Sequence, residues 1–325
     1  MKAIKRSEYG GPAVLKMVMT DTPEPSGNQV LVKVHSLSIN PAEWHIMRGK
    51  IWIIRLAHGL FSPKRPILGG DVAGEVVKVG EAVKDLKIGD RVFGRADHTA
   101  LGEYALLEEP KSATIPDGLS YQEAAALPLV SITAFDALSK AKAPLKGSRV
   151  LINGASGGIG TMAIQMAKAR GAIVHGICSQ KNQSLVQQLG ADQVIDYQAP
   201  DFLEPLETYD LIIDLVGNLD QTKATSLLKE KGVFVMVGFS GFRPMFTFLL
   251  RSLFIRSKSL VTIDATTTTA KLNEIAQSVV ANQIKPVIDQ VYDFEQAQEA
   301  FEHLGSRRAK GKIVLRVERE RLAAI

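Results

Sequence analysis

The chain has 325 residues, 46% of them hydrophobic, and its 39 lysines and arginines stand against 34 aspartates and glutamates. At roughly 150 residues per domain this length predicts about two domains, and the ordinary composition excludes a disordered chain or a collagen-like repeat. The net charge of +5 is dispersed, which argues against nucleic-acid binding. The single cysteine, Cys178, excludes an internal disulfide and a four-cysteine zinc site.

The N-terminal residues lack the apolar centre of a signal peptide. No uncharged apolar run reaches the roughly 18 residues that a membrane span needs. We therefore expect a cytoplasmic protein without a membrane span.

The first 120 residues are predicted to form short strands separated by Gly and Pro turns. Strands are expected at 30–34 and 72–79, and a turn that leads into a strand at 87–94. This pattern favours a partly open β-barrel. From Ser120 onward the composition changes: the stretch 121–142 is rich in Ala and Leu and predicts a helix that Ser120 caps.

Alternating strands and helices follow, and this alternation predicts a parallel sheet covered by helices. Strands are expected at 149–153, 173–178, 194–195, 211–215 and 233–237, with helices at 158–170, 182–189 and 219–228. The last predicted elements are helices at 271–281 and 294–304 and a strand at 312–317. The final strand is expected to pair back with the barrel. The predicted domains are 1–121 with 269–325, and 122–268.

The segment from Val150 to Gly160, VLINGASGGIG, places a glycine-rich turn between a predicted strand and a predicted helix. Dinucleotide-binding folds need small residues there, because the chain turns tightly, its backbone approaches a pyrophosphate and the helix packs close to the strand. The helix N-terminus also offers free N–H groups and the positive end of its dipole. The segment predicts dinucleotide binding; the alternative is a turn that only packs the sheet.

Two enzyme families carry such a loop. The spacing of Gly154, Gly158 and Gly160 resembles the short-chain dehydrogenases. Those enzymes have the loop near the N-terminus and use a Tyr-x-x-x-Lys pair. In this chain no tyrosine is followed by a lysine four residues later, so this assignment is rejected.

The second family fits along nearly the whole chain. The sequence resembles the zinc-independent quinone oxidoreductase (zeta-crystallin-like) branch of the medium-chain dehydrogenases/reductases. The matching positions are Leu151, Ala155 to Gly158, Gly160, Gln165 and Lys168, together with the segments 40–44, 69–74, 89–92 and 311–315. This resemblance implies a GroES-like catalytic domain and a Rossmann domain that binds NADP.

The usual zinc ligands of the family are missing. Zinc-dependent relatives have Gly-His-Glu where this chain has Gly69-Gly70-Asp71, and a cysteine in the region of Asn40. The six histidines show no metal-binding spacing, so we expect no metal. Without a Lewis acid, oxidation of an unactivated alcohol is difficult. Hydride transfer to an already polarised acceptor, a quinone or an α,β-unsaturated carbonyl, remains feasible.

The second strand of the predicted sheet ends without a carboxylate to hold a ribose 2′-hydroxyl. Ser179 and Lys181 are instead suited to a 2′-phosphate, and we expect NADPH; the alternative is that Lys181 is a solvated lysine. The strand ends and the resemblance together imply a set of cofactor contacts. They are Ala155, Ser156, Gly157, Gly158, Ile159, Gly160, Ser179, Lys181, Tyr197, Val216, Gly217, Gly238, Phe239 and Lys312.

The resemblance also implies two catalytic residues beside the nicotinamide, Asn40 and Thr133. Asn before Pro is also a common turn former, and Thr133 could simply bond to its own helix. Trp44 and Phe239 are the predicted substrate-pocket residues. No general acid is evident, so we expect the proton to come from water.

The apolar and basic segment 242–258 has three interpretations: a helix that covers the substrate pocket or a subunit interface, core, or a membrane-surface helix. The resemblance implies a homodimer and a lipophilic carbonyl or quinone as substrate. The sequence thus favours a zinc-independent NADPH-dependent quinone or enone reductase. The alternatives are a non-catalytic NADPH-binding protein, as in crystallin-like or scaffold relatives, and a zinc-free NADP-dependent alcohol dehydrogenase.

Overall fold

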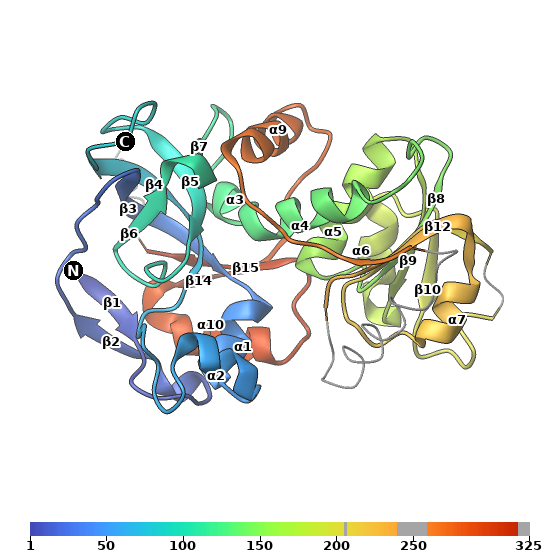
Figure 1. The fold of residues 1–325 in the computed structure, drawn as a ribbon, viewed down its shortest axis with the longest axis horizontal. Coiled ribbons are helices and arrows are strands. Elements are labelled where there is room, and N and C mark those ends of the chain that lie inside the picture. Colours follow the sequence, from blue (N-terminus) through green and yellow to red (C-terminus); the bar gives the residue numbers. More distant parts are fainter. Residues whose placement is uncertain (205–206, 239–258, 318–325) are drawn as a thin grey trace, which may run out of the picture. The chain divides into compact units, whose positions relative to one another are not determined.

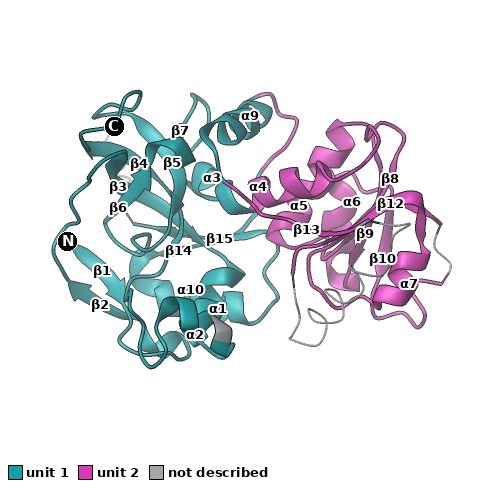
Figure 2. Ribbon diagram, viewed as in Figure 1, with its two compact units in different colours: residues 1–129, 267–280, 286–325 teal, residues 130–266, 281–285 magenta. Residues whose placement is uncertain are grey.

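A computed structural model describes residues 1–204, 207–238 and 259–317 of the chain (Figure 1). It divides into two compact units (Figure 2). Unit 1 comprises Met1–Leu129, Thr267–Val280 and Pro286–Ile325, and unit 2 comprises Val130–Thr266 and Ala281–Lys285. The first division falls after Leu129, later in the chain than the predicted boundary at 121, and unit 1 draws on both ends of the sequence.

Unit 1 is built on a seven-stranded sheet with the order β14-β15-β3-β4-β5-β7, in which β6 also pairs with β3. The strands are β3 (Gln29–Ile39), β4 (Gly70–Val79), β5 (Arg91–Ala96), β6 (Tyr104–Glu108), β7 (Ser112–Thr114), β14 (Ile288–Asp293) and β15 (Lys312–Arg316). Because β4 pairs along most of β3, β6 and β15 share the opposite edge of β3. The predicted return of the last strand to the barrel is confirmed.

Shorter elements complete unit 1. The strands β1 (Lys2–Lys5) and β2 (Lys16–Met19) form an antiparallel pair. The helices are α1 (Pro41–Arg48), α2 (Trp52–His58), α3 (Tyr121–Ala125), α9 (Thr269–Val280) and α10 (Ala297–Gly305), with 3-10 turns at Pro12–Val14, Glu109–Lys111 and Phe294–Gln296. The core lies between the sheet and α10, where Val32, Leu37, Val72 and Phe301 are fully buried or nearly so.

The predicted single helix over 121–142 is wrong, because the structure has two helices there. The first, α3, begins after Ser120, whose Oγ accepts the N–H of Glu123 at 3.2 Å, so the predicted cap is confirmed. The second, α4, runs from Pro128 to Leu138. Proline has no N–H to donate and is favoured at the first position of a helix, so it starts a new helix here.

Unit 2 contains a six-stranded sheet in which all paired strands are parallel, as the alternating pattern predicted. Its order is β10-β9-β8-β11-β12-β13, with β8 (Arg149–Asn153), β9 (Ile173–Cys178), β10 (Gln193–Asp196), β11 (Tyr209–Asp214), β12 (Leu228–Met236) and β13 (Ser259–Thr262). Besides α4, its helices are α5 (Gly158–Ala169), α6 (Gln183–Gln188) and α7 (Gln221–Ser226), with a 3-10 turn at Gln180–Asn182.

The strand order of unit 2 creates a switch point between β8 and β11. The chain runs outward from β8 through β9 to β10, then returns to β11 and runs outward on the other side. Ligands of open parallel sheets bind outside the carboxyl ends of the strands at such a point. Within the described ranges, no helix of either unit has the length and apolarity needed to cross a bilayer.

Candidate active site

Two glycines of the turn after β8 are required by the local backbone conformation and packing. Gly154 has a φ of +83°, in the left-handed region that favours glycine. A Cβ on Gly160 would lie 2.3 Å from the carbonyl oxygen of Gly154, closer than real Cβ contacts allow. These two glycines are therefore required by the fold, whatever the turn binds.

Gly157 differs from its neighbours. Its φ is −80°, which any residue adopts, and a Cβ there would meet only the Gly154 carbonyl oxygen, at an ordinary 3.4 Å. Gly157 precedes α5, and no side chain caps that helix. The first N–H groups of a helix have no partner within the helix. The absence of a side chain at Gly157 leaves this backbone open to a ligand, so the turn fits a dinucleotide phosphate.

The end of β9 lies next to the glycine turn, because β9 pairs with β8, and β10 pairs with β9 on its other side. Asn182 Nδ2 donates to Ser156 Oγ at 2.9 Å and ties the segment after β9 to the turn. Lys181 is exposed, and no hydrogen bond or ion pair links its ammonium to another described residue. Tyr197 is 49% exposed, and its N–H donates to the Cys178 carbonyl at 3.3 Å. The residues predicted to surround the 2′-phosphate and the adenosine thus follow the carboxyl ends of two neighbouring strands of unit 2.

Sequence reasoning gave no role to Asp214, which organises the switch point. Its buried Oδ1 accepts Asn153 Nδ2 at 2.7 Å and the N–H groups of Val216 and Gly217 at 3.1 and 2.8 Å. The carboxylate therefore fixes the turn that presents Val216, which is 40% exposed. An Asp at a strand end with a Gly three residues later, as in Asp214-Leu215-Val216-Gly217, is consistent with a turn, and this pattern was available in the sequence.

The chain after β12, the strand that pairs with β11, is described only as far as Gly238. A Cβ on Gly238 would lie 2.2 Å from the Leu215 carbonyl oxygen, so this glycine lets the two strand ends approach closely. Phe239, predicted for both the cofactor and the substrate pocket, lies outside the described residues, and so does the segment 242–258.

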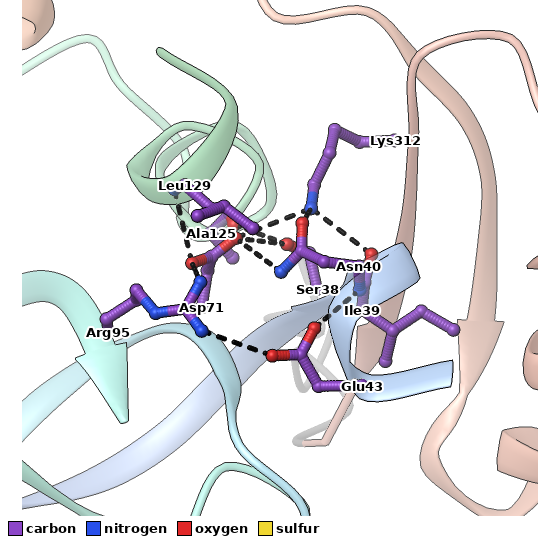
Figure 3. A network of polar contacts seen from close by, with 9 residues as sticks. All are labelled: Ser38, Ile39, Asn40, Glu43, Asp71, Arg95, Ala125, Leu129 and Lys312. Atoms are coloured by element: carbon purple, nitrogen blue, oxygen red, sulfur yellow. Dashed lines mark hydrogen bonds and ion pairs between the residues drawn. The ribbon is translucent and has the colours of Figure 1, made fainter. Parts of the chain in front are cut away.

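A buried polar network occupies the point in unit 1 where β3 ends and α1 begins (Figure 3). Asn40 is 1% exposed, and its Nδ2 donates to Asp71 Oδ2 at 3.1 Å. Its Oδ1 accepts a hydrogen bond from Lys312 Nζ, which also donates to the Ile39 carbonyl at 3.2 Å and to Asp71 at 3.4 Å. The amide of Asn40 is thus held at both ends, and its orientation is set by its partners.

A second carboxylate fixes the same residue through its backbone. Glu43 Oε2 accepts the N–H of Asn40 at 3.0 Å, and Oε1 accepts Arg95 Nη2 at 3.2 Å. Burial raises the pKa of Glu43, although Arg95 opposes the shift. Burial lowers the pKa of Lys312, although the charge of Asp71 opposes that shift. Two acids and two bases thus compensate one another inside unit 1.

The remaining predicted residues lie elsewhere. Thr133 is buried in α4, within unit 2. Trp44 packs against α10, where a Cβ on Gly305 would lie 2.1 Å from its ring, and the Arg48 guanidinium lies 5.3 Å from the ring centre. Trp44 is therefore engaged in the packing of unit 1, and its place in a substrate pocket stays a prediction.

Two family models match the chain. The description "Alcohol dehydrogenase GroES-like domain" fits residues 26–134, and "Zinc-binding dehydrogenase" fits residues 189–315. The chain is 32% identical over 329 residues to a spinach protein named "Quinone-oxidoreductase homolog, chloroplastic", covering 97% of this chain and 98% of that one. It is 33% identical over 329 residues to the Arabidopsis thaliana "NADPH-dependent alkenal/one oxidoreductase, chloroplastic", covering 97% and 79%.

Solved structures give the same result. The quinone oxidoreductase from Coxiella burnetii matches with a TM-score of 0.88 and 32% identity, over 98% of this chain and 99% of that one. The Escherichia coli quinone oxidoreductase in complex with NADPH matches with a TM-score of 0.84 and 27% identity, over 98% and 100%. A GroES-like domain with a Rossmann-like parallel sheet defines a medium-chain dehydrogenase/reductase. Within that superfamily, the chain belongs to the quinone oxidoreductase branch.

The residues of the Asn40 network do not fit a catalytic zinc ion. Zinc binds lone pairs of Cys, His or carboxylate side chains. Here the Asp71 carboxylate already accepts from Ser38 Oγ at 3.3 Å, from Asn40 and from the Lys312 ammonium, which itself brings a positive charge. Among the described residues, no three His, Cys, Asp or Glu side chains are grouped so that they could hold a metal.

The reactivity of Cys178, the last residue of β9, measures how well the carboxyl end of this strand is buried. Burial, and then the charge of Asp196, raise the pKa of its thiol to about 11. At pH 8 about 0.1% of such a thiol is ionised, against about a quarter for an exposed thiol of pKa about 8.5. Because the thiolate is the nucleophile, we expect an aromatic disulfide reagent to modify the native protein at least about 100-fold more slowly than the unfolded protein. Equal rates would contradict a buried, neutral thiol, and the single cysteine makes the count unambiguous.

Proposed function

We propose that the protein is an NADPH-dependent reductase that transfers hydride to a quinone or an α,β-unsaturated carbonyl without zinc. The observation that carries this proposal is the amide of Asn40, which Asp71 and Lys312 hold at both ends in place of a metal site. The names of the relatives support the same reading, since they include a quinone oxidoreductase with NADPH and an alkenal/one oxidoreductase. NADPH, when bound, supplies the hydride that reduces the acceptor.

The edge of the sheet in unit 2 is proposed to hold the cofactor. Gly157 leaves the start of α5 open to the pyrophosphate, which the helix dipole favours. Lys181 and Ser179 are proposed to bind the 2′-phosphate, with Tyr197 beside the adenosine. The turn that Asp214 fixes presents its backbone to the rest of the nucleotide.

Asn40 is proposed to act on the acceptor side. One hydrogen of Nδ2 is used by Asp71, and the second remains for the acceptor oxygen or the nicotinamide amide. A donor whose direction is fixed before the reaction stabilises developing negative charge without reorganising. In this scheme Lys312 is a positioning residue, because its ammonium holds Asn40 from the interior. Thr133 is proposed to contact the nicotinamide side.

The decisive experiment follows NADPH oxidation by the purified, metal-stripped protein with a panel of quinones and 2-alkenals. We expect turnover with at least one of these acceptor classes. We also expect the rate to be the same with and without added zinc. Primary alcohols with NADP⁺ form a third arm of the same panel. Turnover only in that arm would assign the zinc-free alcohol dehydrogenase instead. Cofactor binding with no turnover in any arm would favour the non-catalytic binding protein.

Gly157→Ala separates cofactor binding from folding. The structure accommodates the added methyl group, so we expect an unchanged melting temperature. The same methyl group would obstruct the pyrophosphate, so the Kd for NADPH should rise at least about tenfold, which is about 1.4 kcal/mol. Both quantities can be read from titrations of NADPH fluorescence and from thermal melts.

Two further glycine variants serve as controls. Gly11→Ala adds a methyl group into open space in unit 1 and should change neither quantity. Gly160→Ala forces a Cβ against the turn and should lower the melting temperature. Unchanged NADPH affinity in Gly157→Ala would contradict a pyrophosphate at this turn.

Asn40→Ala tests the proposed donor. Removing one such donor typically costs about 100-fold in kcat, and we expect a loss of that order with little change in the Kd for NADPH. Ser38→Ala is the matched control, because it also removes a hydrogen bond to Asp71 but leaves the Asn40 contacts in place. Equal losses of kcat in the two variants would assign the effect to Asp71 and not to the amide of Asn40.

A further inference from the structure

Unit 1 contains a hollow that adjoins the Asn40 network through Glu43 and Arg95 and to which the proposed function assigns no ligand. Two adjoining cavities, of about 150 and 580 Å³, share a set of lining residues. The shared residues are Arg65, Ile67, Arg95, Asp97 and His98. The smaller cavity extends to Arg6, Glu43 and His58, and the larger one to Lys5 and Lys64. We refer to the two together as the basic cavity.

The lining of the basic cavity carries a surplus of positive charge. Its five lysines and arginines are Lys5, Arg6, Lys64, Arg65 and Arg95, and its three acids are Glu43, Asp97 and Glu108. Glu43 and Arg95 pair with each other, and the remaining cations, Lys5, Arg6, Lys64 and Arg65, then stand against Asp97 and Glu108. A concave surface with this surplus attracts anions.

Two buried guanidinium nitrogens of the lining have no hydrogen-bond partner, although one of them, Arg95 Nη1, lies 4.0 Å from Asp71 Oδ1 in an ion pair. Arg6 is 2% exposed and donates from Nη1 to the carbonyls of Ile46 and Met47, at 2.5 and 3.0 Å. Its Nε, and Nη1 of Arg95, are buried without a hydrogen-bond partner among the described residues. An unsatisfied buried donor costs free energy, and more when it is charged, so an acceptor that reaches Arg6 would stabilise this arginine, whereas Arg95 is already paired with Glu43 and Asp71.

Among the other basic groups of the cavity, Lys5 donates to Thr20 Oγ1 at 2.6 Å, whereas Arg65 is available. Arg65 is exposed and forms no hydrogen bond or ion pair with another described residue. The rings of His58 and His98 lie 6.3 Å apart, centre to centre. Burial lowers the pKa of both histidines, and the charge of Arg65 adds to this effect, so the cavity resists further positive charge. A bound anion would relieve that resistance.

We propose that the basic cavity binds a small oxyanion, in the form of a carboxylate, sulfate or phosphate group, through Arg6, Arg65 and Arg95. Guanidinium groups match such anions in geometry, because two parallel N–H groups donate to two oxygens. All lining residues belong to unit 1, so the site is complete within that unit.

Calorimetric titration of the full chain with sodium sulfate, and separately with sodium acetate, tests the proposal at constant ionic strength and without nucleotide. We expect saturable binding of at least one anion. Tighter sulfate binding would point to an inorganic anion, and tighter acetate binding to the carboxylate of an organic molecule. Arg65→Gln should raise the Kd for the anion at least tenfold. This residue is exposed, so the substitution leaves the core undisturbed. Arg6→Lys, a buried change, gives a second measure if it folds.

Two controls make the result decisive. Arg308→Gln removes an exposed arginine of unit 1 outside the cavity and should leave the Kd unchanged. Lys181→Gln reports binding at the predicted 2′-phosphate position, and it too should leave the Kd unchanged. The proposal is overturned by no saturable binding, by equal affinity in Arg65→Gln and the parent, or by a loss in Lys181→Gln alone. None of these readouts depends on turnover or NADPH, so the proposal can fail while the reductase function stands.

Discussion

The buried carboxylate of Asp71 is the constraint on which the candidate active site depends. It accepts hydrogen bonds from Ser38 and Asn40, from the backbone of Leu129 and from the ammonium of Lys312. A buried charge is tolerated only when it is paired and hydrogen-bonded. The end of β3, the first turn of α4 and the start of β15 are therefore held around one group. The direction of the Asn40 amide is a consequence of that arrangement.

The two units position their polar groups in different ways. In unit 1, charged side chains compensate one another in the interior and fix a neutral amide. In unit 2, glycines shape the turn before α5, and the Asp214 carboxylate fixes the turn after β11 by accepting its backbone N–H groups. The first arrangement suits the orientation of one donor, and the second suits the phosphates of a dinucleotide.

Five of the six strands of the unit 2 sheet could be predicted from local sequence, because buried runs such as 149–153 and 173–178 have strand composition and clear ends, but β13 was not predicted. The break before Pro128 was predictable from proline chemistry, and so was α1, since Asn40 followed by Pro41 is a helix-start signal. The contact between Asn40 and Lys312 was not predictable, because the partners lie 272 positions apart and no local pattern records their pairing.

The late position of β15 in the chain affects the order of assembly. Chains are synthesised from the N-terminus, and domains generally fold as units while synthesis proceeds. Asp71 emerges 241 residues before Lys312, its buried cationic partner, and all of unit 2 is made in between. Until β15 docks on β3, Arg95 is the only other cation that contacts Asp71 or Glu43 among the described residues. Unit 2 is thus free to fold first, and the site of the proposed chemistry is completed near the end of synthesis.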